Sequence, residues 1–502
     1  MKILSSKSRN FGSEMSMGVL SALSMVLAGV SFSALIFTGP LLPYLPVGLS
    51  LILVGWGVAT LYSTFRTKVP TQLMGPQDKP IVILASMVIS SSLGLYTFQE
   101  HALFSTIMTI VVATNLIFGL AMIVVSRYRL SRMAEYIPYP VVGGFLAGTG
   151  YYFLDAAIYV LTGMKLSIVT IPNLLSWPTV FLWGPSLVMG LIMFVLIRRL
   201  KKSWVMQACV AVLWLGFFLV SFYMGFDMET LREAGFFFQP ISNTSFSFWI
   251  QSYHFDSIHW LFIRDHLGDI IALLLLSFLG ALLNLTGLEL GLRQTVDTDH
   301  ELRVVGEVNL LMTFFGGLLS YTQIGPTLLY SRAGASTRVL GIITAIGCFL
   351  CGLFGTGVIA FIPKMVLGAL ILVFAMEFLY TWIFAIRRHI TKIEYGVILM
   401  ILAAIVVVGF LEGILLGLCV SIVMFVVNYS RINVVRSVLS GVETRSNVVR
   451  DVDQKRYLES LGASVNILML HGYVFFGSAT HLMGTIKACF SGKGRQKVKY
   501  II

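Results

Sequence analysis

Long apolar runs alternate with short polar or charged stretches along the whole chain of 502 residues. A membrane-spanning helix needs about 20 mostly apolar residues. Dividing the chain at its charge clusters and Gly/Pro breaks predicts fourteen such segments, two of them short. They lie near 17–38, 46–65, 76–93, 102–126, 139–161, 177–197 and 204–225, and then near 267–289, 304–320, 326–333, 336–359, 363–385, 394–410 and 412–430. The pattern predicts an all-α polytopic membrane protein.

Composition agrees with this pattern. The chain is 57% hydrophobic and only 12% charged, with a mean hydropathy of +0.88. Soluble domains carry about a quarter charged residues, so an ordinary soluble enzyme and a disordered chain are both excluded. The first apolar segment is too long for the core of a cleavable signal peptide. Residues 1–16 are therefore predicted to be a cytoplasmic N-terminal segment that precedes the first span.

The net charge of +12 first suggests a nucleic-acid partner. The distribution of the charge favours a different explanation. With the N-terminus in the cytoplasm, the inner segments hold twenty-one Lys or Arg residues and the outer segments hold four, namely Lys165, Arg232, Arg264 and Lys364. Such a bias is typical of membrane topology. It predicts both termini in the cytoplasm, a location in the cell (plasma or inner) membrane, and no nucleic-acid partner.

The segments fall into two sets of seven, separated by a polar stretch at about 225–266. An odd number of spans in each set inserts the second set upside down relative to the first. Inverted repeats of this kind build secondary transporters. We therefore predict a transporter domain over 17–430, with repeats at about 17–225 and 267–430.

A short motif occurs once in each predicted repeat. The first copy is Thr71-Gln72-Leu73-Met74-Gly75-Pro76 and the second is Thr322-Gln323-Ile324-Gly325-Pro326. Both read T-Q-(aliphatic)-G-P when one insertion is allowed, and their Gly-Pro pairs are 250 residues apart. Paired Gly/Pro breaks at matching places indicate the binding site of a transporter built from inverted repeats.

Proline suits the first turn of a helix, so Pro76 and Pro326 are each expected to begin a half-helix inside the membrane. Helix starts offer free N–H groups and the positive end of the helix dipole, which together bind anions. The alternative is that both motifs only cap helices at the membrane surface. The predicted substrate-binding residues at these breaks are Gly75, Pro76, Gln77, Thr322, Gln323, Gly325, Pro326 and Thr327.

Several stretches resemble the SulP anion permeases (solute carrier family 26). Ile137–Gly150 (I-P-Y-P-V-V-G-G-F-L-A-G-T-G) resembles the fifth-span signature of that family. Asp297–Arg303 resembles the loop before its ninth span, and Gly316–Leu319 resembles the region that follows. The resemblance implies fourteen spans in a 7+7 inverted repeat, a core that moves against a gate or scaffold part, homodimers, and substrates of the sulfate, bicarbonate or chloride class. It also implies that Phe32 lines the site.

The chain departs from the family at two places. Many members carry a Ser and an Arg where this chain has Gly325 and Pro326, so no side-chain charge is available there. Many also carry an acidic residue in the eighth span, where this chain has Asn284, with Glu289 further on. A neutral Asn cannot carry a proton.

Two charged residues follow the first motif. Asp78 and Lys79 are expected in the first turn of the third span, where Lys79 could supply the missing positive charge and Asp78 would oppose an anion. The alternative is that the two pair with each other and position the half-helix. Asp78, Lys79, Asn284 and Glu289 are thus the predicted coupling or charge residues.

The tail after the last span has a different composition. Residues 431–463 are polar and are predicted to be a linker. Ile467–Ala479 resembles the opening of the STAS domain of the same family. Residues 464–502 are therefore predicted to be a partial α/β STAS domain, with strands at Val465–Leu470, Tyr473–Phe476 and Val498–Ile502 and a helix at Ala479–Phe490.

The function that these patterns favour is secondary active transport or exchange of a small inorganic anion by an elevator-like alternating-access mechanism, with a co-transported proton or sodium ion. Two alternatives stay open: a carrier of an uncharged solute on the same fold, and a non-transporting membrane sensor or scaffold. The sequence contains no HExxH metal motif and no phosphate-binding loop. We therefore expect no enzyme activity, no metal and no cofactor.

Overall fold

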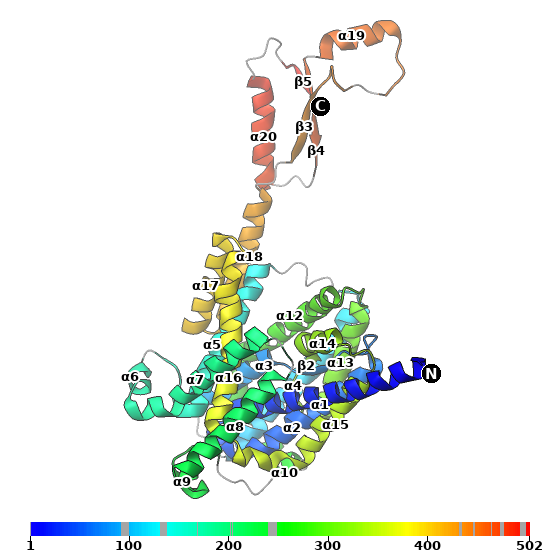
Figure 1. The fold of residues 1–502 in the computed structure, drawn as a ribbon. Coiled ribbons are helices and arrows are strands. Elements are labelled where there is room, and N and C mark those ends of the chain that lie inside the picture. Colours follow the sequence, from blue (N-terminus) through cyan, green and yellow to red (C-terminus); the bar gives the residue numbers. More distant parts are fainter. Residues whose placement is uncertain are drawn as a thin grey trace. The chain divides into compact units, whose positions relative to one another are not determined.

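The computed structural model describes residues 2–91, 100–130, 138–167, 169–200, 202, 204–238, 248–430, 434–444, 447–462, 464–471, 476–491 and 498–502. The chain forms two compact units, Met1–Ile414 and Leu415–Ile502. The first unit contains the candidate functional site and is almost entirely helical (Figure 1). The second unit contains a small sheet.

Each of the fourteen predicted segments lies on one helix. The first seven correspond to α1 (Lys2–Ile36), α2 (Leu45–Arg66), α3 (Asp78–Ser91), α4 (Glu100–Arg127), α5 (Tyr139–Thr162), α7 (Trp177–Leu200) and α8 (Val205–Tyr223). The second seven correspond to α12 (Leu267–Leu292), α13 (Thr298–Phe315), α14 (Ile324–Arg332), α15 (Val339–Phe354), α16 (Lys364–Leu379), α17 (Lys392–Val407) and α18 (Phe410–Ser430). Short helices occupy the connections: α6 (Ile171–Leu174), α9 (Met228–Glu233), α10 (Phe248–Ser252) and α11 (Trp260–Asp265).

Among the described residues, eight helices are long and apolar enough to cross a membrane. These are α1, α2 with the preceding turn, α4, α5, α7, α8, α12 and α16 with its continuation to Arg388. The helices α3 and α14 have 14 and 9 residues, so they are the short, interrupted elements that the Gly/Pro breaks predicted. The chain is thus a polytopic membrane protein, and fourteen spans stay a prediction.

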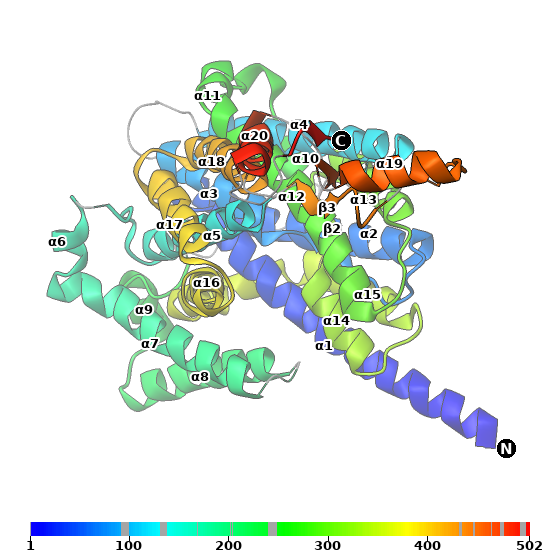
Figure 2. The same cartoon turned by 90° about the horizontal axis from the view of Figure 1, so that it is seen from above.

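Helix contacts divide the first unit into two groups. In one group, α4 packs on α13, and α15 packs on both α1 and α2. In the same group, α12 packs on α3 and α14. The other group is built around α16, which packs on α5 and α7, with α17 also on α5 (Figure 2). Glycines permit the closest crossing: a Cβ at Gly119 of α4 would lie 3.0 Å from the Gly306 carbonyl oxygen of α13. Small residues at such crossings let membrane helices approach closely.

Two short strands join the two halves of the first unit. Strand β1 (Met74–Pro76) pairs antiparallel with β2 (Ser320–Thr322), with Gly75 opposite Tyr321 at the centre. In each half, one residue separates the strand from the next helix, α3 or α14. Equivalent positions are therefore 246 residues apart, as Asp78 and Ile324 show at the two helix starts. A local two-fold axis thus relates the two halves and passes between Gly75 and Tyr321.

This arrangement corrects one prediction about the half-helices. Pro326 is the third residue of α14 and lies in its first turn, as expected. Pro76, however, is the last residue of β1, and α3 begins two residues later. Pro80 is the third residue of α3, so Pro80 and not Pro76 is the structural counterpart of Pro326. The prediction failed because the two T-Q-G-P motifs match each other at a spacing of 250 residues. The strands and helix starts match at a spacing of 246 residues, which is four fewer.

The second unit contains a three-stranded sheet in the order β3–β4–β5. Strand β3 (Val435–Ser440) is antiparallel to β4 (Val465–Leu470), and β5 (Tyr500–Ile501) is parallel to β4. The second unit also contains α19 (Val452–Gly462), α20 (Phe476–Ser491) and the part of α18 from Leu415 onward. The segment 431–463, predicted to be a linker, therefore contains a strand and a helix. Of the strand predicted at 473–476, residues 473–475 lie outside the described residues, and Phe476 begins α20.

Candidate functional site

A cavity of about 570 Å³ lies where the two helix groups of the first unit meet. Its lining comes from α1, α2, α3, α12 and α14 of one group and from α7, α8 and α16 on the other side. Nine of the residues predicted from sequence are in this lining: Phe32, Pro76, Gln77, Asp78, Lys79, Asn284, Gln323, Gly325 and Pro326. The fold thus brings most of the predicted site together.

An aromatic wall forms one side of the cavity. Phe32 of α1 stacks on Trp56 of α2 with ring centroids 6.0 Å apart and an interplanar angle of 2°, and Phe374 of α16 lies 6.0 Å from Phe32. Trp56 is 2% exposed, and its indole Nε1 has no hydrogen-bond partner among the described residues. This buried donor was missed by the sequence reasoning because nothing distinguished Trp56 from other aromatic residues of the spans.

Gly75 lies directly under that indole. A Cβ at position 75 would be 2.1 Å from Trp56 Nε1. Real Cβ atoms do not approach other atoms this closely, so glycine is required there for the backbone to reach the ring. Gly75 itself is not in the cavity lining.

The starts of α3 and α14 both face the cavity. Asp78 and Lys79 line it from α3, and Ile324, Gly325 and Pro326 line it from α14. A Cβ added at Gly325 would meet nothing within 4 Å, so this position faces open space. The positive ends of two helix dipoles therefore lie next to the same cavity. The Asp78 carboxylate accepts a hydrogen bond from the Lys79 backbone N–H at 2.9 Å, within the first turn of α3.

Side-chain amides fasten the strand pair behind these helix starts. Gln77 donates to the carbonyls of Gly75 (3.0 Å) and Tyr321 (2.7 Å). Gln323 donates to the Pro76 carbonyl at 3.2 Å, and Asn284 of α12 donates to the Thr322 carbonyl at 2.8 Å. The Gln323 Oε1 atom is buried and has no partner among the described residues. Gln77 and Gln323 thus join the two halves, Asn284 fixes β2 within the second half, and all three side chains border the cavity.

The remaining predicted residues lie outside the lining. The Thr322 hydroxyl accepts a hydrogen bond from Gln72 at 2.9 Å, and the Thr327 hydroxyl accepts one from the Leu73 backbone N–H at 3.1 Å. Both bonds join the first half to the second, so these hydroxyls brace the site instead of facing the cavity. Glu289 is on α12, outside the set of residues that line the cavity.

Three charged side chains line the cavity: Asp78, Lys79 and Lys202. Lys202 comes from the connection between α7 and α8 and is exposed. The lining therefore carries two positive charges and one negative charge, in addition to the two helix starts. Sequence reasoning treated Lys202 only as a marker of the cytoplasmic side, because its position in the chain gave no sign of proximity to α3.

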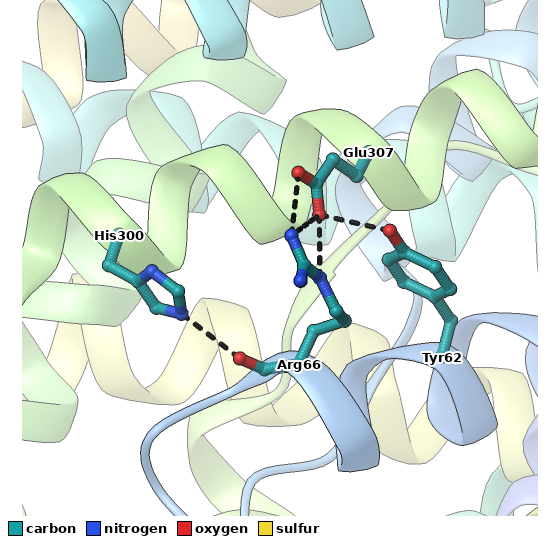
Figure 3. A network of polar contacts seen from close by, with 4 residues as sticks. All are labelled: Tyr62, Arg66, His300 and Glu307. Atoms are coloured by element: carbon teal, nitrogen blue, oxygen red, sulfur yellow. Dashed lines mark hydrogen bonds and ion pairs between the residues drawn. The ribbon is translucent and has the colours of Figure 1, made fainter.

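A polar network on the same helix group joins α2 to α13 (Figure 3). The Nε and Nη2 atoms of Arg66 donate to the Glu307 carboxylate at 3.1–3.2 Å, and the Tyr62 hydroxyl donates to the same carboxylate at 3.0 Å. His300 bonds the Arg66 carbonyl at 3.0 Å. Close by, the fully buried Glu301 accepts from the Thr67 hydroxyl at 2.8 Å. These contacts fix the end of α2 against the other half.

In the part of the chain that the structure describes, no group of three or more His, Cys, Asp or Glu residues could hold a metal ion. The cavity lining contains no such cluster and no phosphate-binding loop. The arrangement is instead suited to hold a small solute between helix starts, amides and a few charges.

Comparison with known proteins agrees with this arrangement. A model of the "Sulfate permease family" matches residues 11–401. The chain is 23% identical to the vacuolar basic amino acid transporter VSB1 of Saccharomyces cerevisiae, over 96% of this chain and 48% of VSB1. The chain thus spans about half the length of that relative.

Two solved structures share the fold. The transmembrane domain of a cyanobacterial bicarbonate transporter, BicA, superimposes with a TM-score of 0.59 at 18% identity, covering 82% of this chain and 98% of BicA's. The overall structure of SLC26A9 superimposes with a TM-score of 0.67 at 15% identity, covering 95% of this chain and 74% of SLC26A9. At these identities the likeness establishes the fold alone.

Proposed function

We propose that the chain, which belongs to the sulfate permease family, is a secondary active transporter or exchanger that carries a small inorganic anion of the sulfate, bicarbonate or chloride class through the cavity between its two helix groups. It is a multi-pass membrane protein of a transporter family and not an enzyme. The observation that carries the proposal is the pair of helix starts, α3 and α14, at one cavity.

The electrostatics of the cavity support an anion. The positive charge of two helix starts and two lysines exceeds the negative charge of one carboxylate, so the electrostatic field at the helix starts favours an anion. Because the position of the family's usual Arg is Pro326, the positive side chains come from Lys79 and Lys202 instead. An anion held this way exchanges part of its water shell for backbone N–H groups and amides.

The contacts also support an elevator-like mechanism. The helix starts, the strand pair and Asn284 belong to one helix group, whereas Ile197, Met206 and Phe374 of the cavity wall belong to the other. A shift of the first group against the second would carry the site across the membrane. We include in the proposal fourteen spans, a homodimer, a location in the plasma or inner membrane with cytoplasmic termini, and a partial STAS domain after the last span.

The cavity lining also bears on coupling to a proton or sodium ion. Asn284 is neutral and donates to the Thr322 carbonyl, so it offers no titratable group. Asp78 is the one carboxylate among the lining residues. We therefore propose Asp78 as the group that a co-transported cation would use.

Uptake of labelled sulfate, bicarbonate and chloride into proteoliposomes tests the proposal. We expect saturable uptake of one of them, and a half-saturation concentration that rises at least about tenfold in Lys79→Gln, since a hydrogen bond to a charged group contributes about 1.5–3 kcal/mol. Lys68→Gln is the matched control, because Lys68 pairs with Asp297 outside the cavity. Absence of saturable flux for every anion would refute the function.

A second candidate is transport of a basic amino acid, as the name of VSB1 states for that relative. The observation that favours it is Asp78, a carboxylate that could hold an ammonium group while a helix start holds the α-carboxylate. Asp78→Asn separates the two functions. It should abolish arginine and lysine uptake if the substrate is an amino acid, but leave or strengthen anion binding if the substrate is an inorganic anion.

A further inference from the structure

A second cavity, of about 660 Å³, lies on α7 and α8 and shares no lining residue with the candidate site. Its walls are apolar side chains, among them Phe181, Met189, Phe217, Val220, Leu231 and Met365. The one polar side chain in its lining is Ser221, whose hydroxyl already donates to the Phe217 carbonyl at 2.9 Å. The cavity walls therefore offer no free hydrogen-bonding side chain to a polar solute.

The apolar surface continues along the same two helices. A smaller recess of about 230 Å³ shares Val212 and Leu213 with the larger cavity and reaches Leu200 and Trp204 at the other end of the pair. Together the two form an elongated groove between α7 and α8, which we call the α7–α8 groove. An elongated apolar groove on a membrane helix pair fits an acyl chain better than a compact molecule.

Two cations come from the chain segments at one end of this groove, next to its lining residues but not among them. Arg232 directly follows Leu231 of the lining, and Lys364 directly precedes Met365. The Lys364 backbone N–H donates to the carbonyl of Phe236, another lining residue, at 2.8 Å. The Arg232 guanidinium stands 5.9 Å from the Phe361 ring. Both cations thus belong to the same small cluster of chain segments.

Among the described residues neither cation has an acidic partner, and the Lys364 Nζ lies 5.3 Å from the centroid of the Phe238 ring. The ion pairs of the described residues include neither of them, and the buried Nε of Arg232 has no hydrogen-bond partner there. Asp227, near Arg232, is engaged with the Thr230 N–H at 2.9 Å, and Glu229 and Glu233 are exposed. The stretch 239–247, whose structure is not described, contains no Asp or Glu. A buried cationic donor without a partner is costly, so a ligand anion would relieve it.

The topology strengthens this point. Arg232 and Lys364 are two of only four Lys or Arg residues predicted for the outer segments. Long basic side chains near helix ends reach the level of the lipid headgroups. A phosphate at that level, attached to an acyl chain in the groove, satisfies both features at once.

We propose that the α7–α8 groove binds one anionic phospholipid, with an acyl chain along α7 and α8 and the phosphate at Arg232 and Lys364. The site is separate from substrate transport and does not depend on which solute is carried. Headgroup contacts with two cations supply specificity, and burial of the chain supplies most of the affinity.

Titration of the detergent-solubilised full chain with phosphatidylglycerol, followed by thermal unfolding and by native mass spectrometry, tests the proposal. We expect a saturable rise of the unfolding temperature and one retained lipid per chain. Arg232→Gln with Lys364→Gln should weaken the apparent affinity at least about tenfold, because two charge-assisted contacts are lost. Arg264→Gln is the matched control, since Arg264 is a predicted outer cation that pairs with Asp265 outside the groove.

A second variant tests the acyl chain. Gly216 lines the groove, and a Cβ there meets nothing within 4 Å, so Gly216→Phe fills the groove without disturbing the helix packing. It should lose lipid retention, whereas Gly396→Phe on α17, also facing open space, should keep it. Equal stabilisation by phosphatidylcholine, equal stabilisation by inorganic phosphate alone, or unchanged lipid binding in either groove variant would each overturn the proposal.

Discussion

Trp56 and Gly75 are in direct contact across the two segments that build the cavity: the space that a Cβ at position 75 would need is occupied by the indole Nε1 at 2.1 Å. The Gly75→Ala variant should therefore lose stability by about 1–3 kcal/mol, the usual cost of overpacking. It should also lower the transport rate, because α3 would shift away from the cavity. Thermal unfolding and proteoliposome flux measure the two effects.

Two further variants test whether the contact between Trp56 and Gly75 causes this loss of stability. In a Trp56→Leu background, Gly75→Ala should cost much less stability than it does in the wild type, since the smaller side chain vacates the space. Gly325→Ala, which faces open space at the start of α14, should fold as well as the wild type. Equal destabilisation by Gly325→Ala and Gly75→Ala would contradict the steric explanation.

Thr327 is predicted to act as a brace between the halves and not as a substrate ligand. Thr327→Val removes the acceptor for the Leu73 N–H and leaves a buried donor unpaired, at a cost of about 1–3 kcal/mol. Thr327→Ser keeps the hydroxyl and should cost much less. A Thr327→Val protein of normal thermal stability but altered substrate affinity would assign the residue to the cavity instead.

The buried Glu301 should matter far more for stability than its exposed neighbour Asp297. Glu301 is fully buried and accepts from the Thr67 hydroxyl and the Lys68 N–H. Glu301→Ala leaves the Lys68 N–H without its acceptor, while the Thr67 hydroxyl still donates to Gln72 Oε1 at 3.0 Å, and we expect a cost of roughly 1–3 kcal/mol. Asp297→Asn breaks only an exposed pair with Lys68 and should cost less than about 1 kcal/mol. Unfolding temperatures of the two variants in one detergent provide the comparison, and similar losses would contradict it.

Acid should remove the small contribution of Asp297. The hydrogen bond from Lys68, followed by that from the His300 N–H, lowers the pKa of this carboxyl below its usual value of 3.8. A carboxyl whose pKa is lowered on folding stabilises the protein above its unfolded pKa, and the contribution disappears as the pH falls through the folded pKa. The difference in unfolding temperature between wild type and Asp297→Asn should thus be present at neutral pH and vanish well below pH 3.8. A difference that persists unchanged in acid would show that the pair is not its origin.

The sequence contained enough information for the helices but not for the exact geometry of the site. The long apolar runs located a helix at every predicted segment, because length and hydrophobicity are local properties. The paired Gly-Pro motifs pointed to the right region, but the true equivalence, Pro80 with Pro326, depends on strand pairing between distant segments. Local similarity of letters cannot reveal that register.

Trp56 and Lys202 were missed for the same reason. Trp56 belongs to the site because α2 packs beside β1, and Lys202 because the α7–α8 connection reaches the same cavity. Neither fact has a local signal in the chain.

The pairing of β1 with β2 has a consequence for how the protein would handle its cargo. Backbone hydrogen bonds and the Gln77, Gln323 and Asn284 amides make the two helix starts one rigid body. If that body travels as a unit, the ligand keeps its contacts with the helix starts and the amides throughout its journey, whereas it leaves Lys202 and Phe374 of the other helix group. Any difference between the affinities for influx and efflux would then come from the residues of that second group and not from the helix starts.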